Sequence, residues 1–241
     1  MSSVLVNKFG IKNNDVVSII APNTQMIYET HFSVPGAGAI IHTINTRLDA
    51  PTIAFQLKHA KSKIVYVDAE FTTVMREALN IMSMDKSMDM DDGNSKLPIV
   101  IDIDDKEYSP NRVLCGGLFL EYEALIAEGD ETFQLIYPSD EWDAISVNYT
   151  SGTTGNPKGV VTHHRGAYLN SLSNSIEWHM ARHPRFLWVV PMFHCNGWCF
   201  AWTLASRAGA RVRVLTIYLS IYLSIYLSIY LSIYLSNKQT P

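Results

Sequence analysis

The sequence predicts an α/β protein in which a largely parallel sheet is flanked by helices. Between residues 16 and 103, short runs rich in β-branched residues alternate with longer segments of helical character. This alternation is typical of parallel strands joined by helical crossovers. The chain has 241 residues, which is enough to bury a sizeable core in one large domain or two small ones.

Local signals place the individual elements. Val16–Ala21 is a β-branched run ended by Pro22, Thr24 is a candidate helix cap, and Pro51 stands in the first turn of a helix, where proline is tolerated. Strands are predicted at residues 16–21, 39–43, 64–67, 97–103, 144–149, 159–162 and 186–190. Helices are predicted at residues 24–34, 51–61, 71–80, 122–127 and 164–180, and a solvated loop at 82–96.

Composition excludes several classes of protein. The net charge is −4 and the isoelectric point is about 6.0, so the chain lacks the basic surface of a nucleic-acid-binding protein. The cysteines are Cys115, Cys195 and Cys199, an odd and sparse set that argues against a disulfide framework. The first residues do not form a secretory signal, because the apolar run is short and polar residues follow it. We therefore expect a cytoplasmic protein.

The segment TSGTTGNPKGV, residues 150–160, has the residue types that bind a polyphosphate. Glycines allow close backbone approach and exposed N–H groups, the hydroxyls of Ser and Thr add short donors, and Lys158 adds a positive charge. An ordinary Gly/Thr-rich turn is the alternative, but such a turn needs neither the hydroxyls nor the lysine. We therefore interpret this segment as a phosphate-binding loop.

This loop is not a Walker A motif, which requires Gly-Lys-Ser/Thr at the start of a helix. Here Lys158 is followed by Gly-Val-Val, a sequence typical of a strand. The loop is therefore predicted to join two strands.

Several motifs in order resemble those of the AMP-binding, adenylate-forming enzymes, the acyl-CoA synthetase superfamily. They are YTSGTTGNPKGVVTHHRGAYL at 149–169, VVPMFHCNGWCFAW at 189–202, and upstream GIKNNDVVSIIAPN and GAIIHTINTRLDAPTIAFQLKHAKSKIVYVDAEF. The combination of DEWDAISVNYTSGTTG with PMFHCNGWC resembles the plant acyl-activating branch. The resemblance covers residues 8–215 and implies part of the large N-terminal domain of the adenylate-forming fold.

The resemblance implies a two-step reaction with ATP, Mg²⁺ and coenzyme A. A short-chain, branched or aromatic carboxylic acid is first converted to an acyl-adenylate, and the thiol of coenzyme A then displaces AMP. The loop residues implied to hold the β- and γ-phosphates with Mg²⁺ are Thr150, Ser151, Gly152, Thr153, Thr154, Gly155 and Lys158. His194 is implied to lie beside the reacting carboxylate, with Asn196 and Gly197 in the same wall.

Two groups of residues have a spacing that could suggest a metal site, but packing or solvation explains each group better. Cys195 and Cys199 are spaced as on a helix next to His194, but no fourth ligand is evident. His179 and His183 also have helical spacing, yet they lack the Glu of a zinc protease and lie beside Pro184. No protein metal ligand is predicted.

The resemblance also predicts what lies outside these residues. No stretch matches the family's later Mg²⁺-contacting glutamate, its ribose-binding aspartate or its C-terminal lysine, so the C-terminal domain is expected to be absent. The predicted divisions are a partial AMP-binding domain at 1–216, a low-complexity repeat at 217–236 and a tail at 237–241.

The repeat IYLS occurs five times in residues 217–236. A repeated four-base DNA string encodes this pattern, so a microsatellite or a faulty gene model explains it without selection on the protein. The rival interpretation is a membrane span, since the length suffices and basic residues flank it, but a Ser and a Tyr in every four residues weaken insertion. A membrane partner is expected only if this segment inserts.

The sequence thus leaves two classes of function open. The first is a fragment of a carboxylic acid–CoA ligase, inactive as this chain stands. The second is a non-catalytic protein, either a nucleotide-binding remnant or a membrane-tethered interaction partner. Full-length relatives of the first class also leave a peroxisomal location open, although this C-terminus carries no peroxisomal signal.

Overall fold

The computed structural model describes residues 1–84, 97–104, 120–150 and 156–212. Its strands are β1 (Val16–Ile20), β2 (Ile40–Thr43), β3 (Ser62–Asp68), β4 (Ile99–Ile103), β5 (Ala144–Thr150), β6 (Lys158–His163), β7 (Arg185–Leu187) and β8 (Ala210–Val212). Its α-helices are α1 (Ser2–Asn7), α2 (Gln25–Gly36), α3 (Ala50–His59), α4 (Thr72–Met84), α5 (Tyr122–Ala127), α6 (His164–Glu177), α7 (Cys195–Trp198) and α8 (Phe200–Ser206). A short 3-10 turn, η1 (Ala69–Phe71), precedes α4.

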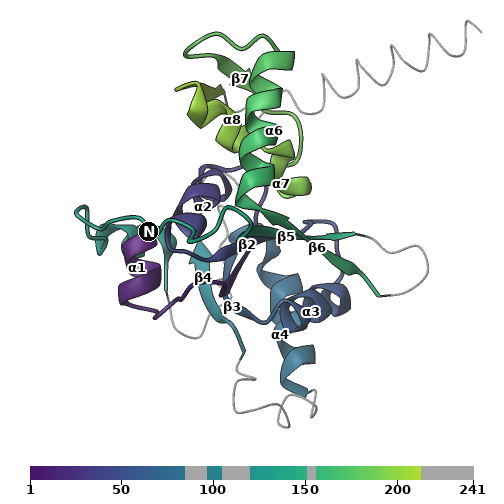
Figure 1. Cartoon of the computed structure of the whole chain (residues 1–241). Helices are drawn as coiled ribbons and strands as arrows, with labels where there is room; N and C mark the ends of the chain where they lie inside the picture. The colour runs from purple at the N-terminus through teal and green to yellow at the C-terminus, as the bar shows by residue number, and fades with distance from the viewer. Residues whose placement is uncertain (85–96, 105–119, 151–155, 213–241) are drawn as a thin grey trace, which may run out of the picture.

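The central sheet has six strands in the order β4-β3-β1-β2-β5-β6. The first five strands are parallel to their neighbours, and β6 pairs with β5 in the antiparallel direction. Helices connect β1 to β2 and β2 to β3 (Figure 1), as expected because parallel strands need crossover connections. The predicted α/β class with a largely parallel sheet is confirmed.

Both faces of the sheet are buried at its inner strands, and alternate residues of β1 and β3 point to opposite cores. On β3, Ile64 and Tyr66 belong to a core shared with α1, α2 and residues 188–204, whereas Val65 and Val67 pack with α3 and α4. Figure 1 shows α3 and α4 together on one side of the sheet and α2 on the other. Near-continuous apolar strands such as KIVYV are the sequence signature of this double burial.

Two helices begin near the residues predicted, one from a candidate cap at Thr24 and one from Pro51. Thr24 is the N-cap residue of α2, and the Asp49 side chain accepts a hydrogen bond from the Thr52 backbone N–H at 3.1 Å at the start of α3. A cap of this kind stabilises a helix by about 1 kcal/mol. Pro51 stands in the first turn of α3, as predicted.

Three predictions of local structure were wrong. The helix α4 continues to Met84, so Met82–Met84 are not in a loop, because Met82 is buried in the α3–α4 core. The strand predicted at 186–190 ends at Leu187 and pairs with β8 in a separate two-stranded sheet. Val190, at the end of the predicted strand, instead bonds to the Asn23 side chain, as described below. Helix α6 ends at Glu177 rather than Met180.

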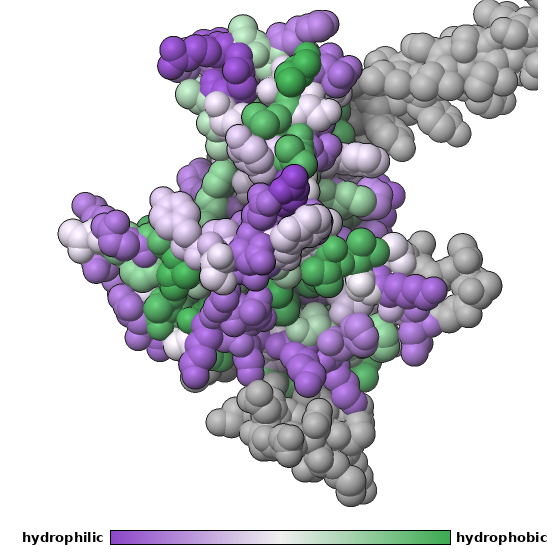
Figure 2. Space-filling model, in the orientation of Figure 1, coloured by the Kyte–Doolittle hydropathy of each residue, from purple (hydrophilic) through white to green (hydrophobic). Residues whose placement is uncertain are grey.

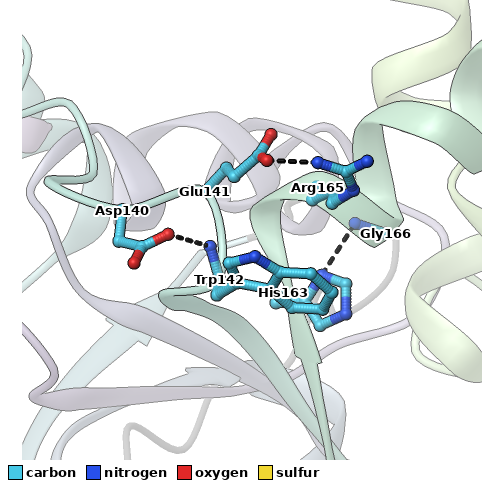
Figure 3. A network of polar contacts seen from close by, with 6 residues as sticks. All are labelled: Asp140, Glu141, Trp142, His163, Arg165 and Gly166. Carbon is cyan, nitrogen blue, oxygen red and sulfur yellow. Dashed lines mark hydrogen bonds and ion pairs between the residues drawn. The ribbon is translucent and has the colours of Figure 1, made fainter.

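A polar network closes the base of the β5–β6 hairpin, where α6 begins (Figure 3). The Arg165 guanidinium pairs with the Glu141 carboxylate and lies 5.6 Å from the centroid of the Trp142 ring. His163 Nδ1 accepts a hydrogen bond from the Gly166 backbone N–H at 2.9 Å and so caps α6. The His163 ring also packs against the Trp142 ring, with 4.6 Å between the ring centroids. These contacts fix the angle at which α6 leaves the hairpin.

Apolar side chains gather on the outer surface of α6 and on the neighbouring β6 (Figure 2). Tyr168, Leu169 and Ile176 of α6 are at least half exposed, as are the Val161 side chain and, nearly, that of Val160 on β6. An apolar helix face is typical of a surface that another element covers.

None of the helices in the described part of the chain combines the length and the apolar character that a membrane span requires.

Two buried histidines predict how the stability of this fold depends on pH. Burial lowers the pKa of both His31 and His42 to about 4, from an ordinary value of 6.5. Above pH 6.5 both are neutral whether folded or unfolded. As the pH falls from 6.5 to about 4, the unfolded chain binds protons that the folded chain excludes, so stability is lost, by about 3 kcal/mol for each histidine.

We expect His31→Phe to reduce this loss by about half. Phenylalanine retains the edge-on ring contact that His31 makes with Trp202, at 5.8 Å between centroids. Urea unfolding of the parent and the variant between about pH 8 and pH 4.5 measures the effect. Parallel stability curves across this range would show that His31 does not carry the pH dependence.

Candidate functional site

The β5–β6 hairpin holds the two ends of the predicted phosphate loop next to each other. Thr150, the last residue of β5, pairs with Lys158, the first residue of β6, and both are exposed. Ser151, Gly152, Thr153, Thr154 and Gly155 lie outside the described residues. The helix α6 begins at His164, five residues beyond Gly159. The prediction that the loop joins two strands, unlike a Walker A loop, is therefore confirmed.

Tyr149, one residue before the loop, is held on the α3 side of the sheet. Its hydroxyl lies 2.7 Å from Nδ1 of His59 on α3, and its ring packs on His42 at 5.1 Å between centroids. Burial raises the pKa of the Tyr149 hydroxyl, so Tyr149 stays a neutral hydrogen-bonding group at neutral pH. Sequence reasoning missed both Tyr149 and His59, since His59 lies 90 residues away on a helix.

The HCNGWC segment, residues 194–199, contains the short element α7 and forms an unusual left-handed turn. Five consecutive residues have positive φ: Cys195 at 45°, Asn196 at 45°, Gly197 at 57°, Trp198 at 57° and Cys199 at 64°. The left-handed conformation costs about 1–2 kcal/mol for each residue with a Cβ atom. Such strain persists only where surrounding contacts over-determine it, and it gathers at functional sites.

Asparagine side chains hold this turn from both ends. Asn23, just after β1, donates from Nδ2 to the Val190 carbonyl at 2.9 Å, and its Oδ1 accepts from the Met192 backbone N–H at 2.7 Å. These two bonds draw residues 190–192 away from strand β7. On the far side, Asn174 Nδ2 on α6 donates to the Trp198 carbonyl at 2.9 Å.

The centre of the turn is tied to two strands of the sheet. The Asn148 side chain on β5 donates from Nδ2 to Asn196 Oδ1 in a short contact. Thr43 at the end of β2 donates from Oγ1 to the Phe193 carbonyl at 2.8 Å, and Asn196 Nδ2 donates back to Thr43 Oγ1 at 3.5 Å. Asn196 is only 2% exposed, so its amide is directed inward.

His194 faces solvent at the start of this turn. Its carbonyl accepts a hydrogen bond from the Gly197 backbone N–H at 2.9 Å, while the imidazole is exposed and Nδ1 lies 3.9 Å from Cys195 Sγ. Gly197 is buried against Trp188. The structure thus brings His194, Asn196 and Gly197 together and attaches them to β5, two residues before Thr150 at the edge of the phosphate loop.

The described part of this site contains no metal-binding group. In residues 1–84, 97–104, 120–150 and 156–212, no three His, Cys, Asp or Glu side chains are grouped so as to hold a metal ion. His179 and His183 lie beyond the end of α6, are exposed and have positive φ. His183 Nδ1 contacts the Ala208 carbonyl at 3.1 Å.

Sequence reasoning missed Asn23, Thr43 and Asn148. All three are polar residues at or just beyond the carboxyl ends of strands β1, β2 and β5, the edge at which ligands bind in open α/β sheets. That position was the signal available in the sequence. Their partners in residues 190–196 are more than 40 residues away in every case.

The fold is similar to that of solved adenylate-forming CoA ligases. A long-chain fatty acid–CoA ligase from Archaeoglobus fulgidus superposes with a TM-score of 0.70 at 19% identity, over 88% of this chain and 37% of that chain. An anthranilate–CoA ligase solved with anthranoyl-AMP superposes with a TM-score of 0.68 at 20% identity, over 88% and 38%. At these identities the likeness concerns the fold.

The family model for AMP-binding enzymes matches residues 1–219, and the chain belongs to this family. An acetate/butyrate–CoA ligase of Arabidopsis thaliana is 46% identical over 204 residues, which are 83% of this chain and 34% of that protein. A peroxisomal benzoate–CoA ligase of Arabidopsis thaliana is 48% identical over 194 residues, 79% and 32%. A peroxisomal trans-cinnamate:CoA ligase of Petunia hybrida is 46% identical over 197 residues, 80% and 34%. The chain therefore spans about a third of the length of these relatives.

The packing of Gly197 predicts that one added methyl group lowers the free energy of unfolding. A Cβ atom at Gly197 would lie 2.7 Å from Trp188 Cζ2, and Trp188 is itself packed edge-on against Tyr28 and Phe186. Overpacking of this kind costs about 1–3 kcal/mol. Gly10 is the matched control, because it also has positive φ, +67°, but a Cβ atom there would meet no other atom within 4 Å.

We therefore expect Gly197→Ala to lower the free energy of unfolding by about 1–3 kcal/mol more than Gly10→Ala does. Urea denaturation of the two variants side by side measures this difference. Equal destabilisation would show that the Trp188 contact has no energetic consequence.

Proposed function

We propose that this chain is part of a carboxylic acid–CoA ligase that activates its acid with ATP through an acyl-adenylate. The observation that carries the proposal is the β5 strand, which ends at the phosphate-loop residue Thr150 and is bonded through Asn148 to the His194 turn. One strand thus joins a segment suited to phosphates to a segment suited to the acid. The family membership and the names of the plant relatives support the same activity.

In the first step of the proposed reaction, a carboxylate oxygen attacks the α-phosphorus of ATP and pyrophosphate leaves. Lys158 and Thr150, with the intervening loop residues, are assigned to the β- and γ-phosphates, where a fixed positive charge and hydroxyl donors stabilise the leaving group. The described residues contain no group of acidic or His/Cys side chains that would hold Mg²⁺. We therefore treat the ion as part of the Mg²⁺–ATP substrate.

In the second step, the thiol of coenzyme A attacks the acyl carbonyl and AMP leaves. His194, exposed at the start of the left-handed turn, is assigned to the neighbourhood of the reacting carboxylate, with Asn196 and Gly197 shaping the wall behind it. The proposed substrate class is a short-chain, branched or aromatic carboxylic acid, and the acetate/butyrate, benzoate and trans-cinnamate ligases named above support its short-chain and aromatic members.

We further propose that these 241 residues alone bind nucleotide weakly and do not form acyl-CoA. Adenylation requires the acid, the α-phosphate and the stabilising charges to be held together in near-contact. The described residues contribute one hairpin with donors for the phosphates and one wall on the acid side.

The division into a partial AMP-binding domain at 1–216, a repeat at 217–236 and a tail at 237–241 also remains a proposal. A cytoplasmic or peroxisomal location is a proposal as well.

The test combines the purified chain with Mg²⁺–ATP, coenzyme A and a panel of short, branched and aromatic acids. We expect nucleotide binding without acid-dependent AMP release. Acid-dependent AMP release would show that the chain is a ligase by itself. Absence of any nucleotide binding would favour an interaction protein, and loss of membrane association on deleting residues 217–236 would identify a tether.

Lys158 offers a direct prediction for the phosphate side. Replacement of Lys158 by Ala removes a charged donor next to Thr150, and hydrogen bonds to charged groups contribute about 1.5–3 kcal/mol. We therefore expect Mg²⁺–ATP and pyrophosphate to bind at least about tenfold more weakly. Lys12→Ala is the control, because Lys12 is also exposed but precedes β1.

Isothermal titration calorimetry of the parent and both variants measures the affinities. If Lys158→Ala binds ATP within twofold of the parent while Lys12→Ala behaves identically, Lys158 does not contact the phosphates.

A further inference from the structure

The middle of the left-handed turn is held by different residues from those that hold its ends. Residues 190–192 are held by Asn23, and the Trp198 carbonyl is held by Asn174 on α6. Between them, the Asn196 side chain is held by Asn148 on β5 and by Thr43 on β2. Removing that central contact leaves both ends attached.

Thr43 lies between the turn and Asn148. Its hydroxyl has two acceptors within reach, the Phe193 carbonyl at 2.8 Å and Asn148 Oδ1 at 3.3 Å, and its oxygen accepts from Asn196 Nδ2 at 3.5 Å. Asn196 Oδ1 accepts from Asn148 Nδ2. Both ends of the buried Asn196 amide are thus satisfied by two different strands, as a buried amide requires.

This arrangement controls the direction of His194 through the backbone. His194 is two residues before Asn196, and its carbonyl accepts from the Gly197 N–H, the residue after Asn196. If Asn196 leaves its place, the strained residues 195–198 lose the contact that opposes their relaxation to ordinary backbone angles. The imidazole at 194 and the thiol at 195 would then change their orientation and exposure.

We propose that Asn148 and Thr43 are positioning residues that hold Asn196 and so set the conformation of the turn that carries His194. Neither residue contacts substrate in this proposal. The acid-side consequence rests on the proposed function, whereas the conformational part does not. Because Asn148 also precedes Thr150 by two residues on β5, it ties the acid side of the site to the strand that leads into the phosphate loop.

The experiment uses the exposed thiol of Cys195 as a reporter, because its Sγ lies 3.9 Å from His194 Nδ1. The full chain is treated with iodoacetamide, and the modification of Cys195 and of the half-buried Cys199 is followed separately by peptide mass spectrometry. The variants are Asn148→Ala, Asn196→Gly, their double variant, Thr43→Val and Thr43→Ser. Asn196→Gly removes the amide without adding strain at a positive φ. Asn80→Ala, at an exposed asparagine of α4, is the control.

We expect Asn148→Ala and Thr43→Val to change the rate of Cys195 modification by about threefold or more, through local opening of the turn. Thr43→Ser should restore the parent rate, because it keeps the hydroxyl, and the Asn80→Ala control should match the parent. The double variant should behave like Asn196→Gly alone, because removal of the Asn196 amide already removes its contact with Asn148. If Asn148→Ala does not fold by circular dichroism, the nearly isosteric Thr43→Val decides.

Two results would overturn the proposal. One is a Cys195 rate unchanged in Asn148→Ala and in Thr43→Val. The other is a rate that rises equally at Cys195 and Cys199 in proportion to lost global stability, since that is the signature of a merely structural role.

Benzoate is then added as an acid probe to the parent and to Asn148→Ala. Protection of Cys195 in the parent and its loss in the variant support the acid-side role. No protection in the parent, with the rate changes still present, removes the acid-side role of the turn in this chain, while the conformational role and the proposed function stand.

Discussion

The pairing of β2 with β5 is the contact on which the rest of the site depends. Ile41 lies opposite Ser146 and His42 opposite Val147, so residues from the first fifth of the chain are joined to a strand about 100 residues later. This pairing places Thr43 at the end of β2 beside Asn148 on β5. In the six-stranded sheet, β2 is the strand that joins the phosphate-loop hairpin to the other strands, because β6 pairs with β5 alone.

The second constraint is that the His194 turn adopts a conformation that its own sequence does not favour. Four residues with a Cβ atom take positive φ in a row with Gly197, and the cost is offset by hydrogen bonds from Asn23, Thr43, Asn148 and Asn174. These donors come from the end of β1, the end of β2, strand β5 and helix α6. A local conformation sustained by four elements is typical of a site in which geometry matters more than local stability.

Much of the fold could be predicted from the sequence because its signals are local. The β-branched run at Val16–Ile20, the proline in the first turn of α3 and the change from loop to strand at Lys158 each act within a few residues. The candidate site residues Lys158, His194, Asn196 and Gly197 came from a resemblance of ordered motifs and stay predictions. The extent of β7 could not be predicted, since Val189 and Val190 have strand propensity but the Val190 carbonyl is taken by a side chain 167 residues away.

The sequence by itself determined the α/β class, the order of strands and helices along the chain, and the place of the Gly/Thr-rich loop between two strands. Periodicity, capping and glycine content act over short distances and can be interpreted without knowing the fold. The tertiary structure alone decided that the Asn196 side chain points inward, that Asn148 and Thr43 receive it, and that His194 remains exposed. The physical reason is that a buried amide is satisfied by whichever donors and acceptors the sheet brings within reach, and strand order in space, β4-β3-β1-β2-β5-β6, differs from strand order in the sequence.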